Sequence, residues 1–159
     1  MHPLFSVSLP TPAETETLGR LLAEFCVPGV QFCLEGPLGA GKSELARVMI
    51  EQACGPQNDI PSPTFTLVQP YQSHAGHEIW HIDLYRLKVA EDALALGIEQ
   101  AFFEATCLIE WPDRLAGYVP SSAMIISLSI TGDTSREADI LAPPSYETQL
   151  ASVLRPLMS

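Results

Sequence analysis

Short apolar runs alternate along the chain with segments whose apolar residues recur every three or four positions. The runs over 30–35 (VQFCLE) and 107–111 (CLIEW) are typical of buried strands, being short and almost wholly apolar. The segments 11–25 and 41–54 carry leucine, valine and methionine at helical spacing. The pattern therefore predicts a domain in which strands and helices alternate.

The predicted helices have recognisable ends. Thr11 is placed to cap the first helix, Pro12 suits its first turn, and Glu14 completes a capping box three residues after Thr11. Gly55 is the expected stop of the helix over 41–54. These signals make the two helices the most clearly bounded elements of the sequence.

The remaining elements are shorter. We expect extended segments over 62–72 and 77–87 joined by a turn at 73–76, one or two short helices over 91–105 interrupted by Gly97, a hairpin of 123–131 with 135–142, and a terminal helix over 146–158. No repeat or linker separates these elements. The sequence therefore predicts one α/β domain over residues 1–159 with a mixed sheet.

Composition supports a folded, acidic protein. The chain is 47% hydrophobic and 17% charged, enough to bury a real core, and its net formal charge is −11. An acidic surface with scattered basic residues repels phosphate backbones, so strong direct nucleic-acid binding is not expected. No apolar run approaches the roughly 20 residues of a membrane span, and "MHPLFSVSLP" lacks the basic start of a signal peptide. We expect a cytoplasmic protein without a membrane segment.

Cysteine and histidine spacings do not indicate a metal site. The cysteines form no C-x-x-C pair and are interpreted as buried, reduced thiols: Cys26, Cys33, Cys54 and Cys107. Three histidines are spaced by three and four residues, which suits a helix, whereas their segment is predicted to be a hairpin: His74, His77 and His81.

A glycine-rich loop follows the first buried strand. It matches G-x-x-x-x-G-K-[ST] over Gly36, Pro37, Leu38, Gly39, Ala40, Gly41, Lys42 and Ser43. Glycines allow backbone N–H groups to converge on phosphate oxygens, and the helix that follows adds the positive end of its dipole. Lys42 is expected to reach the β- and γ-phosphates, and the Ser43 hydroxyl to ligate Mg²⁺.

Two acids end apolar strands elsewhere. Asp83 closes "IWHID" and Glu110 closes "CLIE", and such strand-end carboxylates can face a nucleotide crevice, where metal-assisted phosphoryl transfer needs an acid. Thr64 lies in a proline-bracketed loop that can order against a γ-phosphate. Trp111 follows Glu110 directly, and Pro112 indicates that the strand ends there.

The glycine loop, "SPTFTLV", "HIDLYRL" and "LIEWPDR" occur in one order, and "T-x-x-L-G" begins at Thr15. Together these motifs, over about Thr15 to Ile140, resemble the TsaE (formerly YjeE) family, the bacterial ATPase of tRNA threonylcarbamoyladenosine formation. The resemblance implies a P-loop NTPase-like three-layer α/β sandwich with a mixed central sheet. It also implies ATP and Mg²⁺ as cofactors and slow hydrolysis alone.

The same resemblance implies partners and residue roles. TsaD and TsaB would be the partners, in a complex that modifies adenosine 37 of tRNA. The implied roles are phosphate and metal binding by Lys42 and Ser43, the Mg²⁺-side acid for Asp83, the catalytic and metal-side acid for Glu110, and nucleotide contacts for Thr64, Trp111 and Thr15. The chain departs from the family at Pro37, where an acidic residue is usual, and at Ser43, where threonine is usual.

Three other functions remain open on the residues alone. A small-molecule kinase usually carries an arginine-rich lid, and no such insertion is visible. A GTPase would need a base-reading motif such as N-K-x-D, which is absent. A non-catalytic nucleotide sensor, which would use nucleotide binding only to control assembly, is separated from an ATPase by phosphate release.

Overall fold

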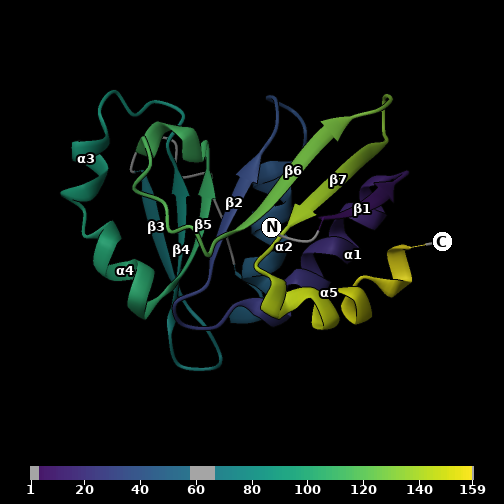
Figure 1. Cartoon of the computed structure of the whole chain (residues 1–159), viewed down its shortest axis with the longest axis horizontal. Coiled ribbons are helices and arrows are strands. Elements are labelled where there is room, and N and C mark those ends of the chain that lie inside the picture. The colour runs from purple at the N-terminus through teal and green to yellow at the C-terminus, as the bar shows by residue number, and fades with distance from the viewer. Residues whose placement is uncertain (1–3, 58–66, 159) are drawn as a thin grey trace.

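The computed structural model describes residues 4–57 and 67–158, and its centre is a seven-stranded sheet (Figure 1). The strand order is β1-β7-β6-β2-β5-β4-β3. The strands are β1 (Leu4–Leu9), β2 (Gln31–Glu35), β3 (Val68–Gln72), β4 (Glu78–Asp83), β5 (Thr106–Glu110), β6 (Met124–Ile130) and β7 (Arg136–Leu141).

The sheet is mixed, as the sequence predicts. Strands β6, β2, β5 and β4 run parallel to one another, whereas β7, β1 and β3 pair antiparallel with their neighbours. The carboxyl ends of the four parallel strands therefore meet at one edge of the sheet. In open α/β sheets this edge is where ligands bind.

Helices cover both faces of the sheet and make three layers. On β5, Leu108 packs into one apolar cluster, while Cys107 and Ile109 pack into another, because successive strand residues point to opposite faces. The first cluster joins the sheet to α1 (Pro12–Leu22), α2 (Lys42–Cys54) and α5 (Glu147–Val153). The second joins it to α3 (Ala90–Leu94) and α4 (Ile98–Glu104), which lie beside β4 and β5 in Figure 1.

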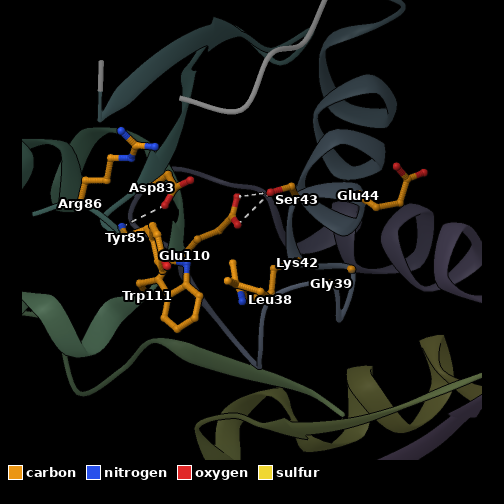
Figure 2. Close-up of a pocket in the computed structure, with 11 residues that line it drawn as sticks. Leu38, Gly39, Lys42, Ser43, Glu44, Asp83, Tyr85, Arg86, Glu110 and Trp111 are labelled. Atoms are coloured by element: carbon orange, nitrogen blue, oxygen red, sulfur yellow. Dashed lines mark hydrogen bonds between the residues drawn. The ribbon is translucent and has the colours of Figure 1, made fainter. Parts of the chain in front are cut away.

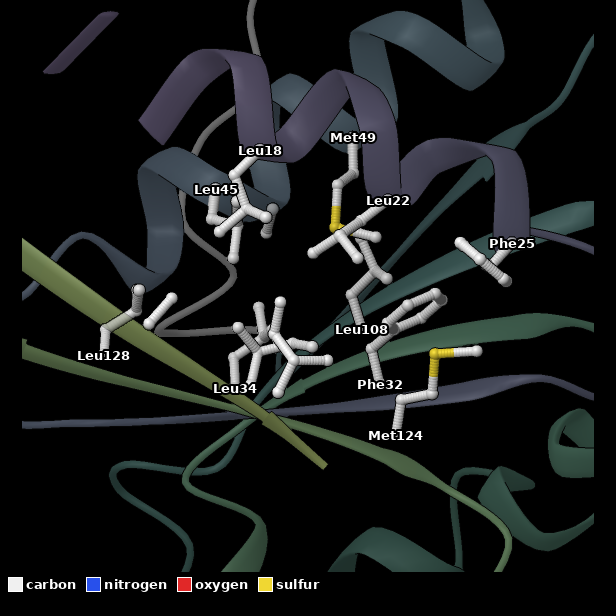
Figure 3. Packing of buried hydrophobic residues seen from close by; sticks show 14 of the residues in the cluster. Leu18, Leu22, Phe25, Phe32, Leu34, Leu45, Met49, Leu108, Met124 and Leu128 are labelled. Atoms are coloured by element: carbon white, nitrogen blue, oxygen red, sulfur yellow. The ribbon is translucent and has the colours of Figure 1, made fainter. Parts of the chain in front are cut away.

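The larger cluster fixes α2 against the sheet. Figure 3 shows side chains of α1 and α2 meeting those of the central strands, and the fully buried members include Leu18, Leu22, Phe32, Leu34, Leu45, Met49, Leu108 and Met124. Burying a side chain of this size contributes about 1.5–3 kcal/mol. The start of α2 is therefore held firmly beside the edge where β2 ends.

Most predicted boundaries are confirmed. The capping box of Thr11 and Glu14 is present, and the Thr11 backbone N–H donates to the Glu14 carboxylate at 2.8 Å. Helix α2 ends before Gly55, and Gly97 (φ +83°) separates α3 from α4. The four cysteines are buried free thiols. None of the helices in the described ranges is both long and apolar enough to cross a bilayer.

Three boundary predictions need correction. Strand β1 was not expected, although Phe5, Val7 and Leu9 alternate with serines and the strand pairs with β7. The extended segment over 77–87 ends at Asp83, and the terminal helix ends at Val153. Pro156 has no N–H and its ring would clash with the carbonyl of Ser152, so the α-helix cannot run through it, and one short 3₁₀ helix (Arg155–Leu157) follows. Part of the extended segment over 62–72 lies outside the described residues.

A half-buried histidine at the start of β4 predicts a pH-dependent stability. His77 Nε2 lies 3.1 Å from Thr106 Oγ1, and burial lowers the pKa of His77 although a hydrogen bond to the Cys26 backbone carbonyl opposes this effect. The unfolded chain then binds a proton more readily than the folded one. This contribution to stability is present above the ordinary histidine pKa of about 6.5 and is lost as the pH falls.

We therefore expect the urea midpoint of the wild type to fall more between pH 7.5 and 5.5 than that of His77→Gln, which cannot titrate at this position. Equilibrium urea unfolding at both pH values measures the difference. Equal pH slopes for the two proteins would contradict the prediction.

Candidate functional site

A cavity of about 420 Å³ opens at the carboxyl edge of the parallel strands. Figure 2 shows that its walls come from the β2–α2 loop, the start of α2 and the ends of β4 and β5. The lining residues are Leu38, Gly39, Gly41, Lys42, Ser43, Glu44, Asp83, Tyr85, Arg86, Glu110 and Trp111. The structure therefore gathers the glycine loop and both predicted strand-end acids around one cavity.

The loop curls through a tight turn before α2 begins. The Ala40 N–H donates to the Pro37 carbonyl at 3.1 Å, and Gly39 at the third position of this turn has φ +81°, as a type II turn requires. Gly41 (φ +106°) then caps α2. The first-turn N–H groups of α2 have no intrahelical acceptors, so this end of the helix favours an anion.

Lys42 is the first residue of α2 and is only 5% exposed. Its ammonium donates to the carbonyls of Gly36 and Pro37, the latter at 3.2 Å, and lies 3.9 Å from the centroid of the Trp111 ring. Burial lowers the pKa of Lys42, and the carboxylates of Glu110 and Asp83 oppose that effect. The cation is thus held inside the loop by neutral oxygens and an aromatic face.

Trp111 leaves the strand in a left-handed conformation. Its φ of +59° is rare for a residue with a side chain, and its carbonyl accepts the Arg114 N–H at 3.2 Å in the turn that follows. The indole packs on Tyr85, with ring centroids 5.1 Å apart. The predicted strand end before Pro112 is confirmed, and the turn carries the indole over Lys42.

The Ser43 hydroxyl and the Glu110 carboxylate meet directly. Ser43 Oγ lies 2.9 Å and 3.0 Å from the two carboxylate oxygens, and Glu110 is 3% exposed. Asp83 is the register partner of Glu110 on the neighbouring strand, and its carboxylate accepts the Tyr85 N–H at 3.0 Å. A hydroxyl and two carboxylates are oxygen ligands of the kind that Mg²⁺ prefers.

The contact of His81 with Glu110 was not predicted. The Nε2 atom of His81 lies 2.7 Å from Oε2 of Glu110 inside the sheet. A signal was available, because His81 precedes Asp83 by two residues and alternation places both on one face of β4. Among the described residues, no group of three or more histidine, cysteine and acidic side chains is arranged to hold a metal ion.

Three predicted loop residues, Gly36, Pro37 and Ala40, shape the loop but are not among the residues that line the cavity. Two further predicted site residues are not placed at the cavity. Thr15 is buried on α1 and does not belong to the cavity lining. Thr64 lies outside the described residues. Arg136 of β7 was not predicted, yet it donates to the Gly39 carbonyl at 3.2 Å. Its sequence position gives no sign of this contact, because it depends on how β7 passes the loop.

The loop's first glycine cannot carry a side chain without strain. Gly36 has φ +143°, and a Cβ atom there would lie 2.5 Å from the backbone oxygen of Leu128. We expect Gly36→Ala to lower the free energy of unfolding by about 2–4 kcal/mol. Gly76→Ala is the matched control, because Gly76 also has positive φ (+97°) but open space around it, so about 1–2 kcal/mol is expected. Urea unfolding tests both, and equal losses would refute the steric argument.

Comparisons with known proteins show the family to which the chain is similar. The family model for "Threonylcarbamoyl adenosine biosynthesis protein TsaE" matches residues 9–138. A tRNA threonylcarbamoyladenosine biosynthesis protein TsaE from Rickettsia felis is 36% identical over 92% of this chain and 85% of that protein. The protein of the same name from Haemophilus influenzae is 39% identical over 75% of this chain and 74% of its own length.

A solved structure agrees as well. The crystal structure of YdiB from Bacillus subtilis superposes with a TM-score of 0.78 at 27% identity and covers 98% of this chain and 97% of that one. The mixed sheet, the glycine loop at the end of β2 and the match over most of the chain all point the same way. The chain belongs to the TsaE family of tRNA threonylcarbamoyladenosine biosynthesis proteins, and its fold is the three-layer α/β fold of P-loop NTPases.

Proposed function

We propose that the chain binds ATP with Mg²⁺ in the cavity beside Lys42 and hydrolyses it slowly, acting in the cytoplasm with TsaD and TsaB in the modification of adenosine 37 of tRNA. The contact of Ser43 with Glu110 is the observation that carries the proposal. It joins the metal-binding hydroxyl of a phosphate loop to a buried strand-end acid, and this pairing is suited to phosphoryl transfer.

The loop supplies the phosphate site. Its backbone amides and the first turn of α2 would hold the phosphate oxygens, over Gly36, Pro37, Leu38, Gly39, Ala40, Gly41, Lys42 and Ser43. The Lys42 ammonium already sits among neutral acceptors, the loop carbonyls, and would exchange them for the β- and γ-phosphates. Pro37 lacks an N–H donor, but its carbonyl closes the turn that shapes the loop.

The two acids would supply Mg²⁺ ligands and the general base. Ser43, Asp83 and Glu110 would hold Mg²⁺, which when bound neutralises charge on the phosphate oxygens. Glu110 is hydrogen-bonded to Ser43. It is also the residue that would orient the attacking water and accept its proton. Trp111, beside Lys42, would contact the nucleotide. The roles of Thr15 and Thr64 rest on the family resemblance alone.

The resting contacts explain why activity without partners would be low. Lys42 is bonded to its own loop and Ser43 to Glu110, so both must exchange partners before a nucleotide is held. Among the described residues that line the cavity, Lys42 and Arg86 are the cations, set against three acids. A partner-supplied cation can accelerate phosphoryl transfer by about 10³–10⁵. The net charge of −11 also favours contact with tRNA through the partners.

Phosphate release from purified protein tests the proposal. We expect slow release from the wild type alone, faster release with saturating TsaD and TsaB, and none above background from Lys42→Ala under either condition. A search for phosphorylated small molecules in the same reactions tests the kinase alternative. No release with saturating partners would reject the ATPase and favour the nucleotide sensor.

A further inference from the structure

A buried histidine lies behind the acidic side of the cavity. His81 is 1% exposed, and its Nε2 is 2.7 Å from Oε2 of Glu110. Parallel pairing sets His81 opposite Leu108 and Asp83 opposite Glu110, so the histidine and the glutamate are diagonal neighbours on one face of the sheet. This face packs against α2, which carries Ser43 at its start.

The geometry also indicates which nitrogen carries the hydrogen. An ionised carboxylate only accepts hydrogen bonds, so the hydrogen of this contact belongs to Nε2. The Nδ1 atom is buried, and no partner for it is found within the described part of the chain. A hydrogen on Nδ1 would be a buried donor without an acceptor, which is unfavourable. A ring with its hydrogen on Nε2 and none on Nδ1 fits the contacts on both sides.

We infer that His81 is a positioning residue for Glu110. By donating Nε2–H to Oε2, it fixes a side chain with three rotatable bonds in the orientation that presents both oxygens to the Ser43 hydroxyl. Partners of this outer kind set the direction of carboxylates at metal and catalytic sites. The inference rests on the proposed ATPase function, because it concerns how the catalytic acid is aimed.

Two substitutions separate the hydrogen bond from packing. His81→Leu removes the donor, whereas His81→Gln keeps an N–H group near the place of Nε2. We expect kcat for ATP with TsaD and TsaB to fall about 10–100-fold in His81→Leu, with KM changed by less than about threefold. His81→Gln should recover kcat to within about threefold of wild type. Equal kcat for His81→Leu and wild type would overturn the inference.

His77 provides a matched control on the same strand pair. It also bridges to β5, through Thr106 at 3.1 Å, but at the opposite end of the strands from the cavity. We expect His77→Leu to lower the urea midpoint and leave kcat unchanged. If His77→Leu lowers kcat as much as His81→Leu does, general loosening of the sheet explains both effects and the positioning role is wrong.

Two readouts do not depend on ATP turnover. Long-range ¹H–¹⁵N correlation spectra of the nucleotide-free wild type should show His81 as the Nε2–H tautomer, and a crystal structure of His81→Leu should show Glu110 turned away from Ser43. An Nδ1–H tautomer, or an unmoved Glu110, overturns the inference. If the wild type releases no phosphate with its partners while the tautomer is Nε2–H, the proposed function fails and the placement of Glu110 by His81 stands.

Discussion

Lys42→Ala should weaken ATP binding by roughly 10–100-fold, because a hydrogen bond to a charged group contributes about 1.5–3 kcal/mol. The fold should survive the change. Lys42 is buried against the carbonyls of Gly36 and Pro37 and the face of Trp111, and burial already disfavours its charge. Removing a desolvated cation therefore costs the nucleotide-free protein little, while the phosphate site loses its main positive charge.

Thermal shift measurements make this prediction quantitative. ATP at a hundred times its wild-type Kd should stabilise the wild type by about 2.7 kcal/mol and Lys42→Ala by only about 0.4–1.4 kcal/mol. Lys88→Ala is the matched control, because Lys88 is exposed and lies outside the cavity lining. An unchanged ATP-induced shift in Lys42→Ala, with the folded state intact, would show that the loop does not hold the phosphates.

The sequence predicts the loop and its flanking elements because they depend on local chemistry. The turn before Ala40, the cap at Gly41 and the stop at Gly55 each need particular residue types at fixed spacing. The apolar strand before the loop and the apolar stripe of α2 follow from periodicity alone. The two acids were also found locally, because each ends an apolar run.

Contacts between distant segments could not be derived in the same way. The pairing of β1 with β7, the approach of Arg136 to Gly39 and the bond of His81 to Glu110 join residues that are far apart in sequence. Each depends on strand order, which apolar patterns do not specify. Once β4 is known to lie beside β5 in parallel register, alternation alone brings His81, Asp83 and Glu110 to one face.

The same strand order indicates which of the two acids, Glu110 or Asp83, is expected to activate water. Strand β5 is the neighbour of β2, so Glu110 stands next to the loop and bonds to Ser43, while Asp83 stands one strand further away. Glu110 contacts the Ser43 hydroxyl, which we propose binds Mg²⁺, and His81 contacts it from the other side, so we expect Glu110 to be better placed for water activation. Asp83, whose carboxylate also receives the Tyr85 N–H, is the more peripheral acid.

Glu110→Gln should therefore lower kcat by about 10²–10⁴, the contribution typical of a positioned general base. Because Glu110 is also a proposed Mg²⁺ ligand, ATP binding is compared at saturating Mg²⁺, where it should change much less than kcat. The amide preserves the size of the side chain. Its oxygen can accept the hydrogen of His81 Nε2, and its NH₂ group can donate to Ser43 Oγ, so the folded site keeps both contacts. What is lost is the negative charge and the capacity to take a proton from water.

Single-turnover phosphate release with TsaD and TsaB separates this loss from binding. We expect Asp83→Asn to retain more activity than Glu110→Gln, and to regain part of its loss at high Mg²⁺, because its defect would lie in metal affinity. Glu78→Gln, at the exposed start of β4, should match the wild type. If Glu110→Gln turns over ATP at the wild-type rate, Glu110 is not the general base, because a neutral amide cannot accept a proton from water.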